Sequence, residues 1–110
     1  MLMELGRLVF DVEVKDVGEN KKVLNNRLAI PISKDETTFV DVVAWGTTAE
    51  LIAKYFKKGF EILVQGHLIN KKRKRDNVEY DTVAILVNRV IFTNGNPKED
   101  SGKDVQDFLR

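Results

Sequence analysis

The sequence predicts an all-β fold, a small barrel of five strands with one helix between the third and fourth strands. Three observations lead to this expectation. Several segments alternate apolar and polar residues with the period of two that is typical of a half-buried strand. One segment, 47–58, has helical spacing instead, and glycines interrupt the strand-like segments where a strand of a closing barrel has to bend.

The predicted strands cover residues 3–14, 23–32, 39–45, 60–68 and 78–92. Gly6 and Gly66 lie inside the first and fourth of them, where a glycine often marks a bulge or a sharp bend. Pro31 indicates that the second strand ends or lies at an edge there. Polar segments with turn-forming residues separate the strands. The core candidates of the second strand are Leu24, Leu28, Ile30 and Ile32.

The helix is predicted from its apolar spacing and from signals at both ends. Thr47 and Glu50 have the spacing of a capping box, and Gly59 follows the last turn, where a glycine commonly ends a helix. The apolar face is formed by Ala49, Ile52, Ala53 and Phe56.

The order of three strands, one helix and two strands matches an OB-fold, a five-stranded, partly open Greek-key barrel. The alternative for this order is an α+β sandwich with the helix on one face of a sheet. Periodicity alone does not choose between the two.

Charge and length favour one domain without a strong global preference for nucleic acid. The chain has 110 residues and a formal net charge of +1, from 18 Lys and Arg against 17 Asp and Glu. We expect a domain at residues 1–93, with 15 Lys and Arg against 13 Asp and Glu, and a flexible polar tail at 94–110. Support for a nucleic-acid partner therefore has to come from the positions of the charges.

Several classes of function are excluded. The sequence has no cysteine and one histidine, which excludes disulfides, cysteine nucleophiles and clusters of histidine around a metal. It has no glycine-rich nucleotide motif, and no pair of carboxylates stands out as an acid–base couple. We expect no enzymatic activity, no metal and no cofactor. No apolar run approaches the ~18–20 residues of a membrane span and no signal peptide is recognisable, so we expect a cytoplasmic protein.

Several runs occur in a specific order along the chain. GRL stands at 6–8, DVVAWG at 41–46 before the helix, AELIAKYFKKG at 49–59, and LVQGHL at 63–68. Tyr80 precedes a last strand rich in Val and Ile. In this order and spacing, the chain resembles the bacterial-type single-stranded DNA-binding proteins over roughly residues 3–92.

The resemblance implies binding and protection of single-stranded DNA, independent of sequence, during replication, recombination or repair. Such proteins stack bases on aromatic rings within a basic groove. Phe39 and Trp45 stand where the family carries stacking aromatics, and Tyr80 belongs to the implied site. Lys34 and Arg73 stand where the family usually has further aromatics. This implies heavier reliance on charge, although an arginine can also lie flat against a base.

The third predicted strand supports an exposed position for the two rings. Strict alternation puts Phe39, Asp41 and Trp45 on one face, opposite Val42 and Ala44. Asp41 makes the first face a poor interior, so the smaller aliphatics are the expected core. The alternative is that the rings are core residues, since large aromatics are usually mostly buried.

A basic run is the strongest local charge signal. It lies between the fourth and fifth predicted strands, where we expect the binding loop of an OB-fold, and we expect it to contact the DNA backbone. The alternative is a solvated hairpin tip. The run consists of Lys71, Lys72, Arg73, Lys74 and Arg75.

The resemblance also implies partners. We expect a homo-oligomer, a tetramer or alternatively a dimer, in which residues 2–10 pair across a two-fold axis because an uncovered apolar edge is a liability. The family ends in an acidic, apolar-tipped peptide that recruits replication and repair proteins. Here residues 104–110 are acidic and apolar in part but end in Arg110, as in a shortened paralogue. An OB-fold adaptor for proteins or RNA in a replication or recombination complex is the alternative function.

Overall fold

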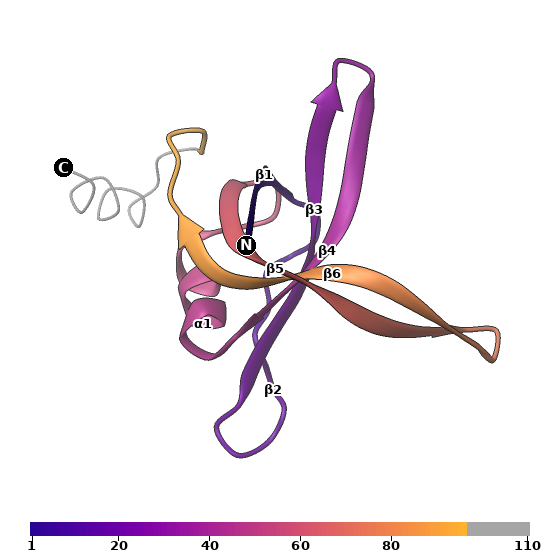
Figure 1. Ribbon diagram of the computed structural model, residues 1–110. Helices are drawn as coiled ribbons and strands as arrows, with labels where there is room; N and C mark the ends of the chain where they lie inside the picture. Colours follow the sequence, from indigo (N-terminus) through magenta and orange to yellow (C-terminus); the bar gives the residue numbers. More distant parts are fainter. Residues whose placement is uncertain (97–110) are drawn as a thin grey trace.

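A computed structural model describes residues 1–96, and residues 97–110, most of the predicted tail, lie outside the described residues (Figure 1). The elements, in chain order, are β1 (Leu2–Leu8), β2 (Lys15–Asp16), β3 (Lys22–Ser33), β4 (Glu36–Trp45), α1 (Gly46–Tyr55), β5 (Glu61–Arg75) and β6 (Val78–Ile91).

The strands of this range form one sheet that closes into a barrel. Their order is β1-β5-β6-β4-β3-β2, and an additional pairing of β1 with β3 closes the circle. Both β1 and β2 lie antiparallel to β3, so together they take the place of one bent barrel strand. The helix then lies between the third and fourth barrel strands, and β4 runs parallel to β6. This is the predicted OB-fold, and it excludes the α+β sandwich.

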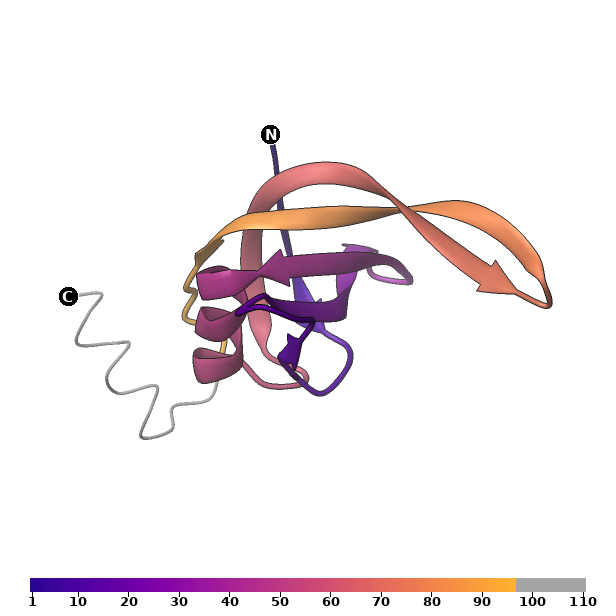
Figure 2. The same ribbon diagram turned by 90° about the horizontal axis from the view of Figure 1, so that it is seen from below.

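The barrel interior is filled by apolar side chains from the long strands and the helix. On β4 the interior side chains are Val42 and Ala44, which are 3% and 1% exposed, as the alternation predicted. Ile52 of α1 and Phe56, just after it, are buried against them. Fully burying one such large side chain contributes about 1.5–3 kcal/mol. The helix thereby covers one end of the barrel, and the β5–β6 hairpin extends away from the other end (Figure 2).

Gly6 and Gly66 both lie where two backbones approach closely. A Cβ atom on Gly6 would be 2.7 Å from the carbonyl oxygen of Ala29, at the point where β1 begins to pair with β3. A Cβ atom on Gly66 would overlap the carbonyl of Leu86, beside the register shift between β5 and β6. The predicted bulge is confirmed at Gly66, and larger residues at either position would force the barrel strands apart.

The first strand ends earlier than predicted, at Leu8 instead of residue 14. Beyond it the chain follows β3 through a hydrogen bond from the Val9 N–H to the Arg27 carbonyl. The next contact is made by a side chain: the amide of Asn26 accepts from the N–H of Phe10 and donates to its carbonyl, both at 3.1 Å. Phe10 is therefore outside the strand and 52% exposed.

The helix and the second strand also differ from the prediction. The predicted capping box is wrong, because Trp45 precedes the helix with no side-chain cap hydrogen bond. The helix ends at Tyr55 instead of residue 58, because Phe56 already has an extended backbone. Ile32, a predicted core residue, is 59% exposed near the end of β3. Within residues 1–96, no helix is long and apolar enough to cross a membrane.

Two hairpins extend beyond the barrel, and we call them the β3–β4 arm and the β5–β6 arm (Figure 1). The β3–β4 arm turns at Lys34 and Asp35. Pairing in the β5–β6 arm continues to Arg75, and the turn consists of Asp76 and Asn77, with φ of 53° and 63°. A two-residue loop with positive φ at both positions is a type I′ turn, which Asp and Asn tolerate.

Candidate nucleic-acid interface

One outer face of the sheet brings together the predicted aromatics and part of the basic run. We call it the groove face, and its members follow from strand register, because residues directly opposite in an antiparallel pair point to the same side. On β4 and β3 they are Phe39, Asp41, Val43, Trp45, Val23, Asn25, Arg27 and Ala29. On β5 and β6 they include Ile69, Lys71, Arg73, Arg75, Val78, Tyr80, Thr82 and Ala84.

A small apolar cluster forms the floor of this face. Val23, Val43 and Ala84 are 6%, 7% and 0% exposed and lie together outside the barrel interior, with Ile69 packed against them. The cluster joins β3, β4, β5 and β6. The base of the β5–β6 arm is therefore packed against β3 and β4, which fixes the position of the side chains above it.

The two aromatic rings of β4 lie on the groove face and are open to solvent. Phe39 is 56% exposed and Trp45 is 48% exposed, whereas Asp41 between them is 8% exposed. The interpretation of both rings as core residues is therefore wrong. Half-exposed rings on a rigid strand present the flat surface on which a base can stack.

A groove of about 510 Å³ lies between the two arms. The predicted site residues that line it are Phe39, Arg73, Arg75 and Tyr80. Arg27 and Thr82 also line it. A hollow of about 460 Å³, lined by Arg73, Lys74, Arg75 and Tyr80, lies along the β5–β6 arm. Trp45 lies farther along β4, and Lys34 lies at the turn of the other arm, so the structure does not gather all predicted residues in one groove.

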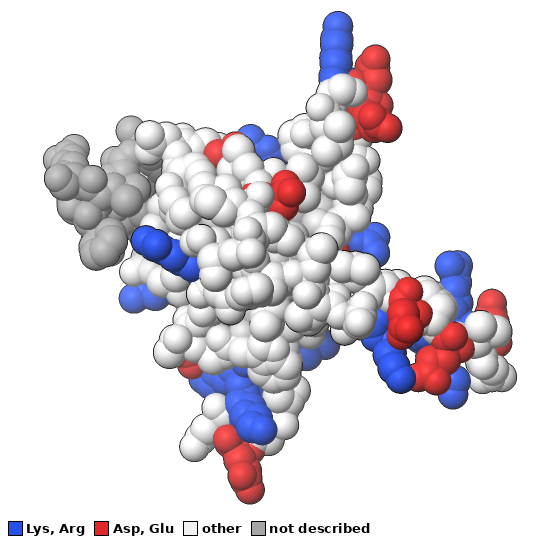
Figure 3. All heavy atoms as spheres, in the orientation of Figure 1, with Lys and Arg blue, Asp and Glu red and all other residues white. Residues whose placement is uncertain are grey.

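The basic run does not form a loop. It is the last part of β5, because the type I′ turn allows pairing to continue to its end. Strand alternation divides it: Lys71, Arg73 and Arg75 lie on the groove face, and Lys72 and Lys74 lie on the opposite face. Those two lysines stand directly across the arm from Asp81 and Glu79. Positive and negative side chains accordingly occur together on this arm (Figure 3).

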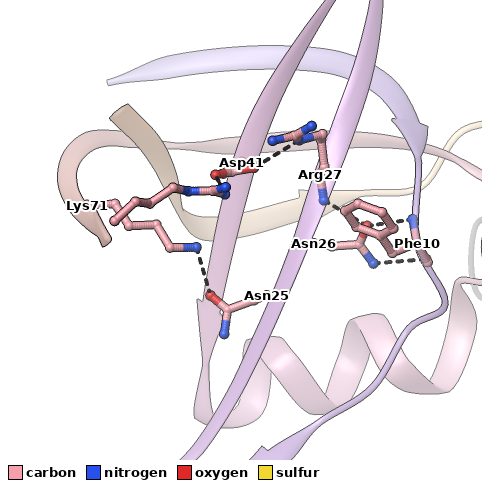
Figure 4. Close-up of polar contacts among 7 residues, drawn as sticks. Phe10, Asn25, Asn26, Arg27, Asp41 and Lys71 are labelled. Carbon is pink, nitrogen blue, oxygen red and sulfur yellow. Dashed lines mark hydrogen bonds and ion pairs between the residues drawn. The ribbon is translucent and has the colours of Figure 1, made fainter. Parts of the chain in front are cut away.

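The groove face contains a charged bridge that sequence reasoning missed. Asp41 of β4 accepts a hydrogen bond from Nε of Arg27 of β3 at 3.1 Å, and its other carboxylate oxygen accepts from Arg73 of β5. Lys71 is 3.5 Å from the side-chain oxygen of Asn25 (Figure 4). The bridge therefore connects three strands across the groove face.

The charges around Asp41 determine its ionisation. Burial raises the pKa of its carboxyl, but the hydrogen bond from Arg27 and the positive charges of Arg73, Arg27 and Lys71 lower it more, so the pKa lies below its ordinary value of 3.8. Asp41 is consequently ionised at neutral pH. One signal in the sequence pointed to this role: alternation placed an acidic residue between two exposed rings, where it needs cationic neighbours.

The arrangement can hold a nucleic-acid strand. Within residues 1–96, no group of three His, Cys, Asp or Glu side chains could hold a metal ion. Rings, guanidinium groups and ammonium groups are the means by which OB-folds contact single strands. The fold and this face together define an oligonucleotide-binding barrel.

Comparisons with known proteins agree. A model of the single-strand binding protein family matches residues 1–93. The chain is 33% identical over 107 residues to the single-stranded DNA-binding protein of Fusobacterium nucleatum, which covers 88% of this chain and 67% of that protein. It is 30% identical over 105 residues to the single-stranded DNA-binding protein of Clostridium perfringens, and this match covers 89% of this chain and 70% of that protein. It is also 34% identical over 61 residues to the single-stranded DNA-binding protein of Aquifex aeolicus, and this match covers 56% of this chain and 42% of that protein. The chain belongs to the single-strand binding protein family.

The family assigns the general function. Its members bind single-stranded DNA in replication, recombination and repair and are not enzymes, so this chain is a non-enzymatic single-stranded DNA-binding protein.

Proposed function

We propose that the protein binds single-stranded DNA through the groove face, without sequence preference. The observation that supports this is the pair of half-exposed rings, Phe39 and Trp45, on the same face of β4 as the cations of the neighbouring strands. A ring on such a face can stack on any base, because every base has a π-face. The cations attract the phosphates and release condensed counterions, which favours binding regardless of sequence.

The role proposed for each side chain follows from its position on the groove face or on one of the two arms. Trp45 and Phe39 provide stacking surfaces along β4, and Tyr80 provides a third ring on the β5–β6 arm. Lys71, Arg73 and Arg75, which lie along β5, contact the phosphate backbone of the DNA. Arg27 adds a cation on β3. Lys34 stands at the turn of the β3–β4 arm and extends the positive surface toward its tip. Lys74 contributes at the hollow along the β5–β6 arm.

Fluorescence of Trp45 tests this proposal directly, because it is the one tryptophan of the chain. Oligo-dT should quench its emission strongly, whereas duplex of the same length should bind more weakly and quench less. Binding of oligo-dT with unchanged emission, and with full affinity after Trp45→Ala, would contradict the groove face as the site. Tighter binding of oligo-rU than of oligo-dT would instead favour the RNA adaptor.

A homo-oligomer, a tetramer or alternatively a dimer, is also proposed. One edge of β1 pairs with β5 over Leu2–Arg7, but its other edge pairs with β3 at Arg7 and Leu8 alone among the described residues. Met3 and Leu5 on this strand are 50% and 44% exposed. Pairing of two copies of β1 around a two-fold axis would cover both the free edge and these side chains.

The remaining proposals concern the tail and the place of action. The DNA-binding domain is proposed for residues 1–93, with residues 94–110 as its tail. The side chain of Asn96 still exchanges hydrogen bonds with the backbone of Glu61. Recruitment of replication or repair proteins would depend on residues outside the described range. The proposed location is the cytoplasm, at the nucleoid, where single-stranded DNA is exposed.

A further inference from the structure

Asp41 is the acidic residue of the groove face, and its place is unusual for a surface that attracts phosphate. Its side chain is 9% exposed, whereas the side chains of Arg27 and Arg73 are 37% and 36% exposed. Each carboxylate oxygen accepts from a different arginine. The carboxylate thus lies under two guanidinium groups that reach it from β3 and β5.

The bridge leaves most of each arginine available. A guanidinium group carries five N–H donors, and the contact with Asp41 uses Nε of Arg27 and one terminal nitrogen of Arg73. Both arginines line the groove beside Phe39 and Tyr80. Their other donors suit a phosphate, and their planar faces suit a base. An unbridged arginine would have to be ordered when DNA binds, at a cost in conformational entropy.

We propose that Asp41 is a positioning residue for DNA binding: it holds Arg27 and Arg73 in the orientation in which they contact the strand, and it ties the β5–β6 arm to β4. This inference rests on the groove face being the DNA site. Asp41 has two opposed effects on the binding of DNA. Asp41 repels phosphate through its charge and favours binding through the arginines, and the second effect outweighs the first.

Because the two effects of Asp41 are opposed, the direction in which Asp41→Asn changes the affinity for DNA shows which of them is larger. Asp41→Asn removes a negative charge from the groove, so charge alone would make it bind oligo-dT more tightly. Positioning requires weaker binding, by about tenfold, the loss expected for hydrogen bonds to a charged group. Asp81→Asn is the matched control, since it changes the net charge equally but lies on the arm face opposite the groove. It should bind as tightly as the original protein or slightly more tightly.

The salt dependence of affinity separates positioning from a purely structural role. If Arg27 and Arg73 no longer contact phosphates in Asp41→Asn, the slope of log K against log[salt] should flatten by up to about 1.4, although the net charge has increased. A folded variant that has merely lost stability would keep the slope. Thermal melting of each variant shows that it is folded at the temperature of the titration.

A second variant tests the inference even if Asp41→Asn does not fold. Arg73→Lys keeps the charge and leaves the pair of Asp41 with Arg27 in place, but it cannot reproduce the fixed fork of the guanidinium group. It should also bind oligo-dT about tenfold more weakly. Tighter binding by Asp41→Asn, or full affinity in Arg73→Lys, would overturn the inference. Failure of Trp45→Ala to weaken binding would instead contradict the groove face itself.

Discussion

Arg73 lies directly opposite Tyr80 on the β5–β6 arm, with both side chains on the groove face. The resemblance to the family placed an aromatic at the position of Arg73. The ring beside this position is that of Tyr80 on the neighbouring strand, and it is 40% exposed. A guanidinium plane beside a phenol ring can receive a base as two adjacent rings do, because arginine stacks on π-systems. The arm therefore still presents an exposed ring, Tyr80, on which a base can stack.

Replacing Trp45 by alanine should weaken binding of oligo-dT by about 1–3 kcal/mol, the usual contribution of one base–aromatic stack. The stability of the fold should change little, because the ring is half exposed. Affinity is measured by fluorescence anisotropy of labelled oligo-dT and stability by urea unfolding. Phe10→Ala is the control, because Phe10 is 52% exposed but lies beside the edge of β3 that faces away from β4. Equal losses in the two variants would contradict a specific role for Trp45.

Replacing Asn26 by alanine should destabilise the fold by on the order of 1–3 kcal/mol. Asn26 is 4% exposed, and its amide takes the place of a strand partner for Phe10. Its loss leaves the backbone groups of Phe10 without these bonds just where the first barrel strand bends. Urea unfolding measures the change. DNA affinity of the folded variant should be unchanged, and a large loss of affinity at full stability would show that Asn26 belongs to the site.

The lowered pKa of Asp41 predicts an acid-sensitive contribution to stability. The carboxyl titrates below its ordinary pKa of 3.8 in the folded chain, so the folded state binds the proton less readily than the unfolded state. The stabilisation is therefore fully present above pH 3.8 and is lost as the pH falls through the lowered value. Urea unfolding of the original protein and of Asp41→Asn should differ most near neutral pH and converge in strong acid. A constant difference across this range would contradict the ion pairs.

Replacing Leu5 by arginine should reduce the mass of the particle in solution. Leu5 is 44% exposed on β1, and a charge there would be buried or repelled if two copies of β1 pair. Light scattering measures the mass. Val17→Arg, at a similarly exposed apolar residue between β2 and β3, should leave it unchanged. A monomeric mass for the original protein would contradict the proposed assembly.

Local alternation in the sequence was sufficient for most strands and for the outward face of the rings. Val42 and Ala44 are buried and Phe39 is exposed because successive side chains of a strand point to opposite faces. The choice of a barrel over a sandwich came from the order of the elements and from the resemblance to a family.

The sequence was insufficient for contacts between strands distant in the chain. The bridge from Asp41 to Arg73 joins residues whose register depends on the bulge beside Gly66 and on the length of the β5–β6 arm. The basic run was expected in a loop, but the two-residue turn at Asp76 and Asn77 lets β5 and β6 pair along its whole length, so its cations lie in two rows on opposite faces.

The two rows of the basic run should differ in their effect on DNA binding. Lys71→Gln with Arg75→Gln removes two cations from the groove face, and Lys72→Gln with Lys74→Gln removes two from the opposite face. The net charge changes equally in both. The first pair should flatten the slope of log K against log[salt] by about 1.4, since each phosphate neutralised on a single strand contributes about 0.7. The second pair should change it by less than half of that, because those lysines stand opposite Asp81 and Glu79.

Titrations of oligo-dT over a series of salt concentrations measure both slopes, and oligo-dT and oligo-dA should give the same differences, since phosphate contacts carry no sequence information. Trp45→Ala serves as the reference for stacking: it should lower affinity at every salt concentration and leave the slope nearly unchanged, because stacking releases few ions. Equal flattening by the two pairs would show that the arm acts through its total charge. An unchanged slope in both would show that the run is a solvated arm and that the phosphates are bound elsewhere.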